Sequence, residues 1–146
     1  MEGIDLEIVR LLSRDGRKSF TDLGKETGLS TSAVHQRVRR LEQRGVLSGY
    51  VAHVDHTAVG LGLAAFVAVK PIDPAAPDDT PERLACIPAV EACYSVAGDY
   101  SYFLLVRVAN PVALEELLAD IRAKGNVSTH STIVMSTAYE RRPPGV

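Results

Sequence analysis

The sequence lacks the marks of a secreted, membrane-spanning or metal-binding protein. It has no run of 18 apolar residues, and its N-terminus has neither the basic start nor the continuous apolar stretch of a signal peptide. We therefore expect a cytoplasmic protein that does not cross a membrane. Its two cysteines, Cys86 and Cys93, lack the CxxC or Cys/His spacing of a metal site and lie in an apolar region. We expect them to be buried, reduced thiols.

Enzyme motifs are missing as well. The chain contains no GxSxG motif, phosphate-binding loop or dinucleotide-binding glycine pattern. One local cluster, HVDH at residues 53–56, contains metal-ligand types, but a strand would place its two histidines on opposite faces, and no third ligand is nearby. We therefore expect no catalytic residue, no metal and no cofactor.

Charge is nearly balanced over the whole chain but not along it. The 146 residues carry a net charge of −2. Residues 1–50 contain nine Lys or Arg and seven Asp or Glu, whereas residues 51–146 contain seven and eleven. At residues 30–45, four arginines accompany one glutamate, a balance of +3 that suits a polyanion. The length and the 46% hydrophobic content favour two small units over one.

The first fifty residues are predicted to form three helices joined by tight turns. Apolar residues recur at helical spacing over residues 4–12, before an Asp-Gly pair. Ser19 and Asp22 have the form of a capping box for a second helix, which Gly28 ends. The third helix is predicted over residues 30–45. Three short helices, with the third reached through a glycine turn, are typical of helix-turn-helix domains, which present the third helix to the major groove of DNA.

The third helix combines a packing face with a polar, cationic face. At about 100° per residue, Val34, Val38 and Leu41 lie on one stripe. On the other side, Arg39 can donate two hydrogen bonds to guanine and Gln36 can pair with adenine, while the helix start suits a phosphate oxygen. The predicted DNA-binding residues are Ser30, Thr31 and Ser32 at the helix start, His35, Gln36 and Arg39 toward the bases, and Arg37, Arg40 and Arg44 toward phosphates. The alternative is an ordinary solvated surface helix.

From residue 61 the pattern changes from helical to alternating. Strands are predicted at 61–69, 90–98, 101–108 and 127–139, with helices starting at Thr80 and Asn110 and ending at Pro88 and Gly125. This β-α-β-β-α-β order is that of a ferredoxin-like domain. We therefore predict an α+β protein with a three-helix helix-turn-helix domain at residues 1–50, a β linker at 51–60 and a ferredoxin-like domain at 61–146.

One face of the predicted sheet is left uncovered by its two helices. The stretch SYFLLVRV alternates between two sets, Tyr102, Leu104, Val106, Val108 and Ser101, Phe103, Leu105, Arg107. Either set would present apolar side chains on the open face, which implies a partner. The alternative is that the N-terminal helices of the same chain cover this face.

Two segments, GLSTSAVHQRVRRLEQRGVLSGY and DGRKSFTDL, resemble the N-terminal part of the Lrp/AsnC family of transcription regulators, the leucine-responsive or feast/famine proteins. The similarity continues to about Tyr139. It implies that the ferredoxin-like domain dimerises through its sheet and that dimers assemble into octamers or related rings. It also implies two further partners, double-stranded DNA and a small molecule, usually an amino acid.

The resemblance places the small molecule between dimers, near the loop that joins the second and third strands of the ferredoxin-like domain. Here that loop is VAGDYSYFLLV, in which Ser101 stands where aspartate is common, so contact with a ligand amine is weaker unless Asp99 compensates. Thr132 matches a threonine near the same cleft, and His130 lies beside it. The predicted effector-binding residues are Val96, Gly98, Asp99, Tyr100, Ser101, His130 and Thr132. Structural roles are the alternative: a turn for Gly98, packing for Tyr100 and strand formation for Thr132.

The sequence therefore predicts a sequence-specific DNA-binding transcription regulator and not an enzyme. We expect a homodimer or octamer whose assembly and DNA affinity respond to an amino acid. Two alternatives stay open: an architectural protein that wraps DNA with little sequence preference and, through the resemblance alone, a tetrapyrrole decarboxylase of the same fold.

Overall fold

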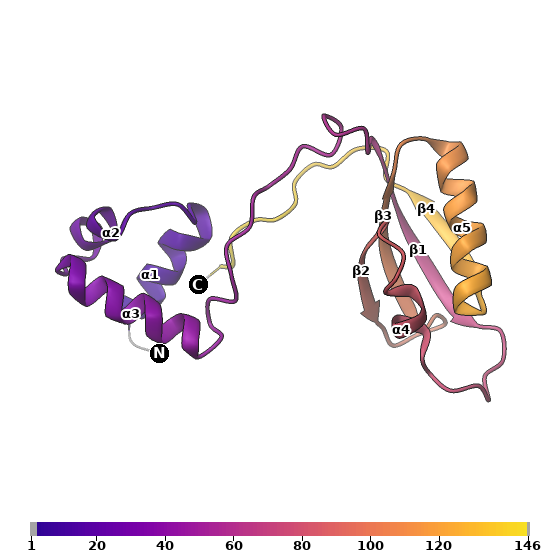
Figure 1. Cartoon of the computed structure of the whole chain (residues 1–146), viewed down its shortest axis with the longest axis horizontal. Helices are drawn as coiled ribbons and strands as arrows, with labels where there is room; N and C mark the ends of the chain where they lie inside the picture. The colour runs from indigo at the N-terminus through magenta and orange to yellow at the C-terminus, as the bar shows by residue number, and fades with distance from the viewer. Residues whose placement is uncertain (1–2, 146) are drawn as a thin grey trace. The chain divides into compact units, whose positions relative to one another are not determined.

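The computed structural model describes residues 3–145, which form two units (Figure 1). The helical unit comprises Met1–His53 and Ala138–Val146, and the sheet unit comprises Val54–Thr137. The C-terminal segment, which falls inside the predicted ferredoxin-like domain of residues 61–146, groups instead with the helical unit.

Three helices make up the folded part of the helical unit: α1 (Gly3–Arg14), α2 (Phe20–Thr27) and α3 (Thr31–Gln43). The predicted capping box is present, since the Ser19 hydroxyl accepts a hydrogen bond from the Asp22 backbone N–H and donates one to its carboxylate. Gly28 ends α2 at a φ of +73°, a conformation that favours glycine. The three helices enclose one apolar core, formed by Ile8, Leu11, Leu12, Leu23, Val34, Val38 and Leu41.

The sheet unit has the predicted ferredoxin-like order. Its elements are β1 (Leu63–Pro71), α4 (Thr80–Leu84), β2 (Val90–Ser95), β3 (Tyr102–Val108), α5 (Pro111–Gly125) and β4 (Val127–Ile133). The strands lie in the order β2-β3-β1-β4, and each pairs antiparallel with its neighbour. This topology confirms the fold class.

The two helices of the sheet unit leave one face of the sheet open. Along β3 the set beginning with Tyr102 is buried, whereas the set containing Phe103 points to the open side. Phe66 in β1 and Phe103 remain 50% and 43% exposed in the single chain. The sheet therefore presents aromatic side chains on a face that no residue of the sheet unit covers.

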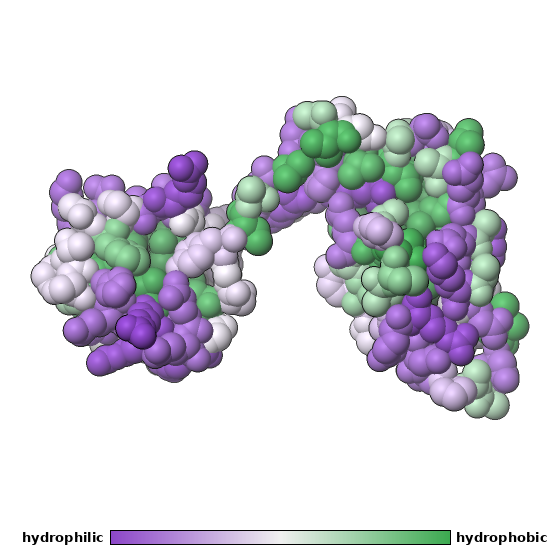
Figure 2. Space-filling model, viewed as in Figure 1, coloured by the Kyte–Doolittle hydropathy of each residue, from purple (hydrophilic) through white to green (hydrophobic). Residues whose placement is uncertain are grey.

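The predicted β linker forms no strand within the described residues. Residues 48–55 pair with no neighbouring strand, and a tight turn follows at residues 56–60. A lone extended segment cannot satisfy a strand's hydrogen bonds without a partner strand. Its apolar side chains stay in solvent, with Val51 82% and Val59 59% exposed, and Figure 2 shows hydrophobic surface along this segment.

Two further expectations are wrong in detail. The last strand ends at Ile133 rather than at residue 139, because its partner β1 begins at Leu63 and the ladder closes with a hydrogen bond from Val134 N–H to the Ala64 carbonyl. Cys86 and Cys93 are free thiols as expected, but both are exposed rather than buried. Cys93 lies on β2, an edge strand with a neighbour on one side only, so its apolar surroundings in sequence do not bury it.

Candidate nucleic-acid interface and effector site

The helix α3 is held in the helical unit by the stripe predicted from its period. Val34, Val38 and Leu41 are each at most 1% exposed. Ser30 caps the helix, since its hydroxyl oxygen accepts a hydrogen bond from the Ala33 N–H at 3.2 Å. The opposite face of α3 is therefore fixed in direction while it stays in solvent.

A close approach between α2 and the turn before α3 sets the spacing of the two helices. The Leu29 N–H donates to the Gly24 carbonyl at 3.0 Å. A Cβ on Gly24 would lie only 2.6 Å from the Leu29 carbonyl oxygen, so this position accepts no side chain without a shift of backbone. The absence of a side chain at Gly24 thus sets the position of Ser30, the residue that caps α3.

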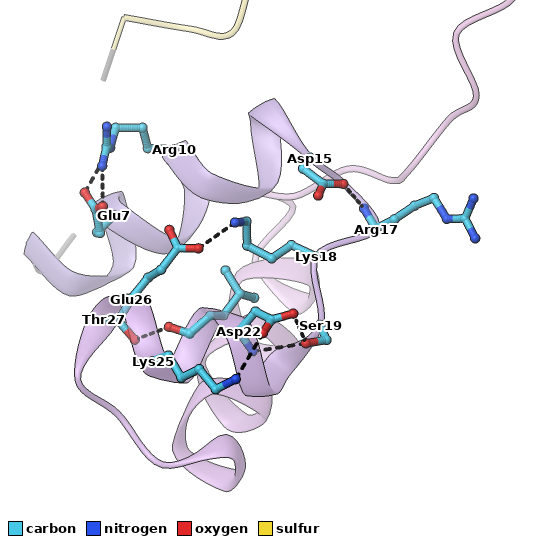
Figure 3. Close-up of polar contacts among 11 residues, drawn as sticks. Glu7, Arg10, Asp15, Arg17, Lys18, Ser19, Asp22, Lys25, Glu26 and Thr27 are labelled. Carbon is cyan, nitrogen blue, oxygen red and sulfur yellow. Dashed lines mark hydrogen bonds and ion pairs between the residues drawn. The ribbon is translucent and has the colours of Figure 1, made fainter.

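Ion pairs and hydrogen bonds fasten the first two helices (Figure 3). Lys18, which precedes α2, binds Glu26 at 2.6 Å, and this carboxylate raises the pKa of the lysine. The hydrogen bond from Ser19 holds the pKa of Asp22 below its usual value. The Asp22 carboxylate therefore keeps its negative charge at the positive, N-terminal end of α2. These contacts support the scaffold that carries α3.

One of the predicted phosphate anchors has a structural partner. Arg37 donates to the Asp5 carboxylate of α1 at 2.8 Å, and the two side chains are 27% and 14% exposed. This pair joins residues 32 positions apart and ties α3 to α1. Arg37 is therefore engaged inside the helical unit, whereas sequence analysis assigned it to phosphate.

The two other arginines of α3, and Arg44 just after its last residue, differ from Arg37. Arg39, Arg40 and Arg44 are exposed, and none of them forms an ion pair within residues 3–145. His35 lies beside them in sequence but packs edge-on against the Phe20 ring, with 5.2 Å between ring centroids. The exposed face of α3 thus offers three unneutralised guanidinium groups together with Ser32 and Gln36, which are also exposed.

The loop between β2 and β3 is a closed hairpin turn. The Val96 N–H donates to the Ser101 carbonyl, and the Ser101 N–H donates to the Val69 carbonyl of β1, both at 3.0 Å. Gly98 has a φ of +145°, which agrees with the turn expected at this position. The hairpin therefore holds Tyr100 and Ser101 at a fixed place beside β1.

Four of the seven predicted effector residues line one of two hollows. The first, which we call the aromatic hollow, has a volume of about 300 Å³ and is lined by Phe66, Ala68, Tyr100, Phe103, His130 and Thr132. The strand register explains it, since Phe66 is opposite Thr132 and Ala68 is opposite both His130 and Phe103. Tyr100 stacks on His130 with 6.0 Å between ring centroids.

The second hollow, which we call the loop hollow, has a volume of about 240 Å³ and is lined by Lys70, Pro71, Pro74, Ala76, Asp78 and Ser101. Ser101 is its one predicted residue. Val96, Gly98 and Asp99 line neither hollow. Lys70 and Asp78, which come from the end of β1 and the proline-rich loop before α4, line this hollow but are not among the predicted effector residues.

A buried tyrosine orients the carboxylate in the loop hollow. The Tyr102 hydroxyl donates to Asp78 Oδ1 at 2.6 Å, although 24 residues separate the two in sequence. This hydrogen bond raises the pKa of Tyr102 to about 12. Because the Tyr102 ring is only 6% exposed and belongs to the sheet core, it gives Asp78 a rigid support.

Comparison with known proteins accounts for both halves of the chain. Residues 1–42 match the AsnC-type helix-turn-helix domain, and residues 64–144 match the Lrp/AsnC ligand binding domain. The chain belongs to the Lrp/AsnC family. It is 54% identical to the HTH-type transcriptional regulator LrpA of Mycobacterium tuberculosis, over 97% of this chain and 95% of that protein. It is 34% identical to the leucine-responsive regulatory protein of Salmonella typhimurium, over 92% and 85% of the two chains.

Solved structures of Lrp/AsnC proteins share the fold. A feast or famine regulatory protein from M. tuberculosis, complexed with L-methionine, superposes with a TM-score of 0.95 at 54% identity, covering 98% of this chain and 99% of that one. The relatives are transcriptional regulators and not enzymes, which argues against the decarboxylase alternative. No helix within residues 3–145 is long and apolar enough to cross a membrane, and no group of three or more potential metal ligands occurs there.

Proposed function

We propose that this Lrp/AsnC protein is a cytoplasmic, sequence-specific transcription regulator whose DNA affinity responds to an amino acid. In this proposal residues 1–50 bind double-stranded DNA, residues 51–60 link the domains, and residues 61–146 bind the effector and oligomerise. The observation that carries it is the exposed face of α3, whose free guanidinium groups project from a helix fixed by a buried stripe. The L-methionine complex of a relative supports an amino acid as the effector.

Within α3 the proposed roles follow from exposure and partners. Arg39 reads guanine through two hydrogen bonds, while Arg40 and Arg44 bind phosphates and supply salt-dependent affinity. Ser30, Thr31 and Ser32 place the first backbone N–H groups of the helix, which have no intrahelical partner, toward a phosphate. Arg37 positions α3 through Asp5, and His35 is supported by Phe20.

The proposed assembly is a homodimer formed through the open sheet face, with dimers joining into octamers or similar rings. The exposed Phe66 and Phe103 side chains support this choice, since burial of such rings provides a large part of interface energy. The effector acts by linkage: it favours one assembly of the paired helix-turn-helix units and so changes DNA affinity. The hairpin, with Tyr100, His130 and Thr132 beside it, is the proposed effector region.

Gel-shift titration tests both halves of the proposal. Arg39→Ala should reduce discrimination between the operator and a one-base variant by about 1–3 kcal/mol, because the guanine contact is lost. The matched control, Arg40→Ala, should weaken binding to both sequences alike and lower the salt dependence by about one counterion. Light scattering should show wild-type size for both variants. Unchanged discrimination in Arg39→Ala would contradict the orientation of α3.

The effector half is tested with free amino acids at fixed salt and protein concentration, beginning with L-methionine. A change in operator affinity is expected, and no response to any amino acid would refute this half. Competition with unrelated duplex separates a regulator from an architectural protein, because a specific regulator should prefer its site by roughly 10³-fold or more.

A further inference from the structure

The chain leaves the helical unit at a residue that is held in place, Tyr50. Its hydroxyl donates a hydrogen bond to Glu42 Oε1 of α3 at 3.0 Å. Its ring lies against the turn between α1 and α2, since a Cβ added to Gly16 would be 3.3 Å from Tyr50 Cδ1. Tyr50 therefore anchors the start of the linker to α3 and to the turn before α2.

The linker reaches the sheet unit at a second anchored residue, His56. Its Nδ1 atom lies 3.7 Å from Glu91 Oε1 on β2, and Glu91 Oε2 accepts a hydrogen bond from Arg107 Nε on β3 at 2.9 Å. The side chains of His56, Glu91 and Arg107 are only 20%, 28% and 11% exposed. They form a largely covered cluster that holds the linker against two neighbouring strands.

A closed turn connects this cluster to the start of the sheet. Asp55 Oδ1 accepts hydrogen bonds from the N–H groups of Thr57 and Ala58 at 3.0 and 3.2 Å. The Leu61 N–H donates to the His56 carbonyl at 2.8 Å. Residues 55–61 are thus one turn, and His56 attaches that turn to the sheet.

Residues 51–54, between the two anchors, have no contact of this kind. Within residues 3–145 they form no hydrogen bond and no ion pair. Val51 is 82% and Val54 48% exposed, and the boundary between the two units falls between His53 and Val54. The only part of the linker without an anchor is therefore the part that contains this boundary.

We propose that Tyr50 and His56 are positioning residues that confine the joint between the two units to residues 51–54. They thereby limit how far apart two paired helix-turn-helix units can bind on DNA. This inference rests on the proposed function, in which a dimer reads two half-sites. The effective concentration of the second DNA-binding unit at its half-site falls roughly as the −3/2 power of joint length. Release of His56 extends the joint to residues 51–60 and should lower operator affinity about fourfold.

Gel-shift titration of the full-length protein on two duplexes tests the proposal. The first is an operator selected from random duplexes by the wild-type protein, and the second has about five base pairs, half a helical turn, inserted between its half-sites. The wild type should bind the second duplex about 10²-fold more weakly, because one unit of the dimer loses its half-site.

His56→Ala and Tyr50→Ala should each show a smaller penalty for the insertion, because a longer joint lets the second unit reach its displaced half-site. Asp120→Asn is the matched control. It removes a carboxylate that pairs with Lys124 on α5, away from the linker, and should keep the wild-type penalty.

Hydrogen exchange of the free protein separates loss of an anchor from loss of structure. In the wild type, the bonded amides of Thr57, Ala58 and Leu61 should exchange more slowly than those of residues 52–54. His56→Ala should speed exchange at residues 55–61 and leave β3 unchanged. Faster exchange in β3 as well would mean that His56 supports the sheet rather than the joint, which overturns its assignment.

The outcomes distinguish this inference from the function on which it rests. If the wild type prefers the selected spacing and either variant shows the same penalty, the anchor removed in that variant is overturned while the proposed function stands. If the wild type binds both duplexes equally well, the inference and the paired reading of half-sites are both overturned.

Discussion

Substitution of Gly24 by alanine should disturb the helix-turn-helix geometry from within. The added Cβ would lie 2.6 Å from the Leu29 carbonyl oxygen and 3.7 Å from the carbonyl carbons of Leu29 and Ser30. Because the nearest atom is backbone rather than the end of a flexible side chain, α2 and the following turn must separate. Overpacking of this kind costs about 1–3 kcal/mol, and we expect the upper part of that range.

Alanine also favours helix over glycine by about 1 kcal/mol, which offsets part of the cost. The net expectation for Gly24→Ala is a fall of about 1–2 kcal/mol in the free energy of unfolding, measured by urea titration with far-ultraviolet circular dichroism. Gly3→Ala is the matched control, since no atom lies within 4 Å of its added Cβ, and its stability should equal or exceed that of the wild type.

The same substitution should weaken operator binding. Displacement of Leu29 moves Ser30, the N-cap of α3, and with it the residues that follow. Operator affinity of Gly24→Ala should fall more than that of Gly3→Ala at a temperature where both proteins are folded. Wild-type stability together with wild-type operator affinity in Gly24→Ala would refute the close approach as the determinant of helix spacing.

Two further predictions concern single hydrogen bonds. Arg37→Ala should lower the free energy of unfolding by about 1–3 kcal/mol, because it leaves the largely buried Asp5 carboxylate without this donor. The control Arg40→Ala should change the free energy of unfolding by less than about 0.5 kcal/mol. Equal effects of the two substitutions in urea titrations would contradict this difference between the two arginines. The pKa of Tyr102 is raised to about 12, above its usual value of 10, so its contribution to stability is present below pH 10 and is lost as the pH rises toward 12. Tyr102→Phe should therefore show a flatter decline in stability over this window, and parallel wild-type and variant curves would refute the role of the Asp78 bond.

The features that the sequence predicts well are local ones. Ser19 and Ser30 lie within three residues of the backbone N–H groups that they cap, and the buried stripe of α3 follows from a single helical period. The β-α-β-β-α-β order likewise follows from patterns contained within each element. These signals need no knowledge of what packs against the element.

The features that the sequence does not predict depend on distant residues. Arg37 has the pattern of a phosphate anchor until α1 brings Asp5 to it across 32 positions. Asp78 lies in a loop with no motif, and its place beside Ser101 depends on the meeting of two loops at one end of the sheet. Strand formation in the linker would need a second strand, and the exposure of Cys93 depends on which strand lies at the sheet edge.

The chain passes between its two units twice, so the sheet unit is an insertion within the helical one. Its first and last strands, β1 and β4, are antiparallel neighbours, with Ala65 opposite Ile133. The chain of the inserted segment, Val54–Thr137, therefore enters β1 and leaves β4 at the same end of the sheet. Domains with neighbouring termini tolerate exchange and insertion. The ferredoxin-like unit of a relative could accordingly replace this segment while the three helices of the helical unit are kept.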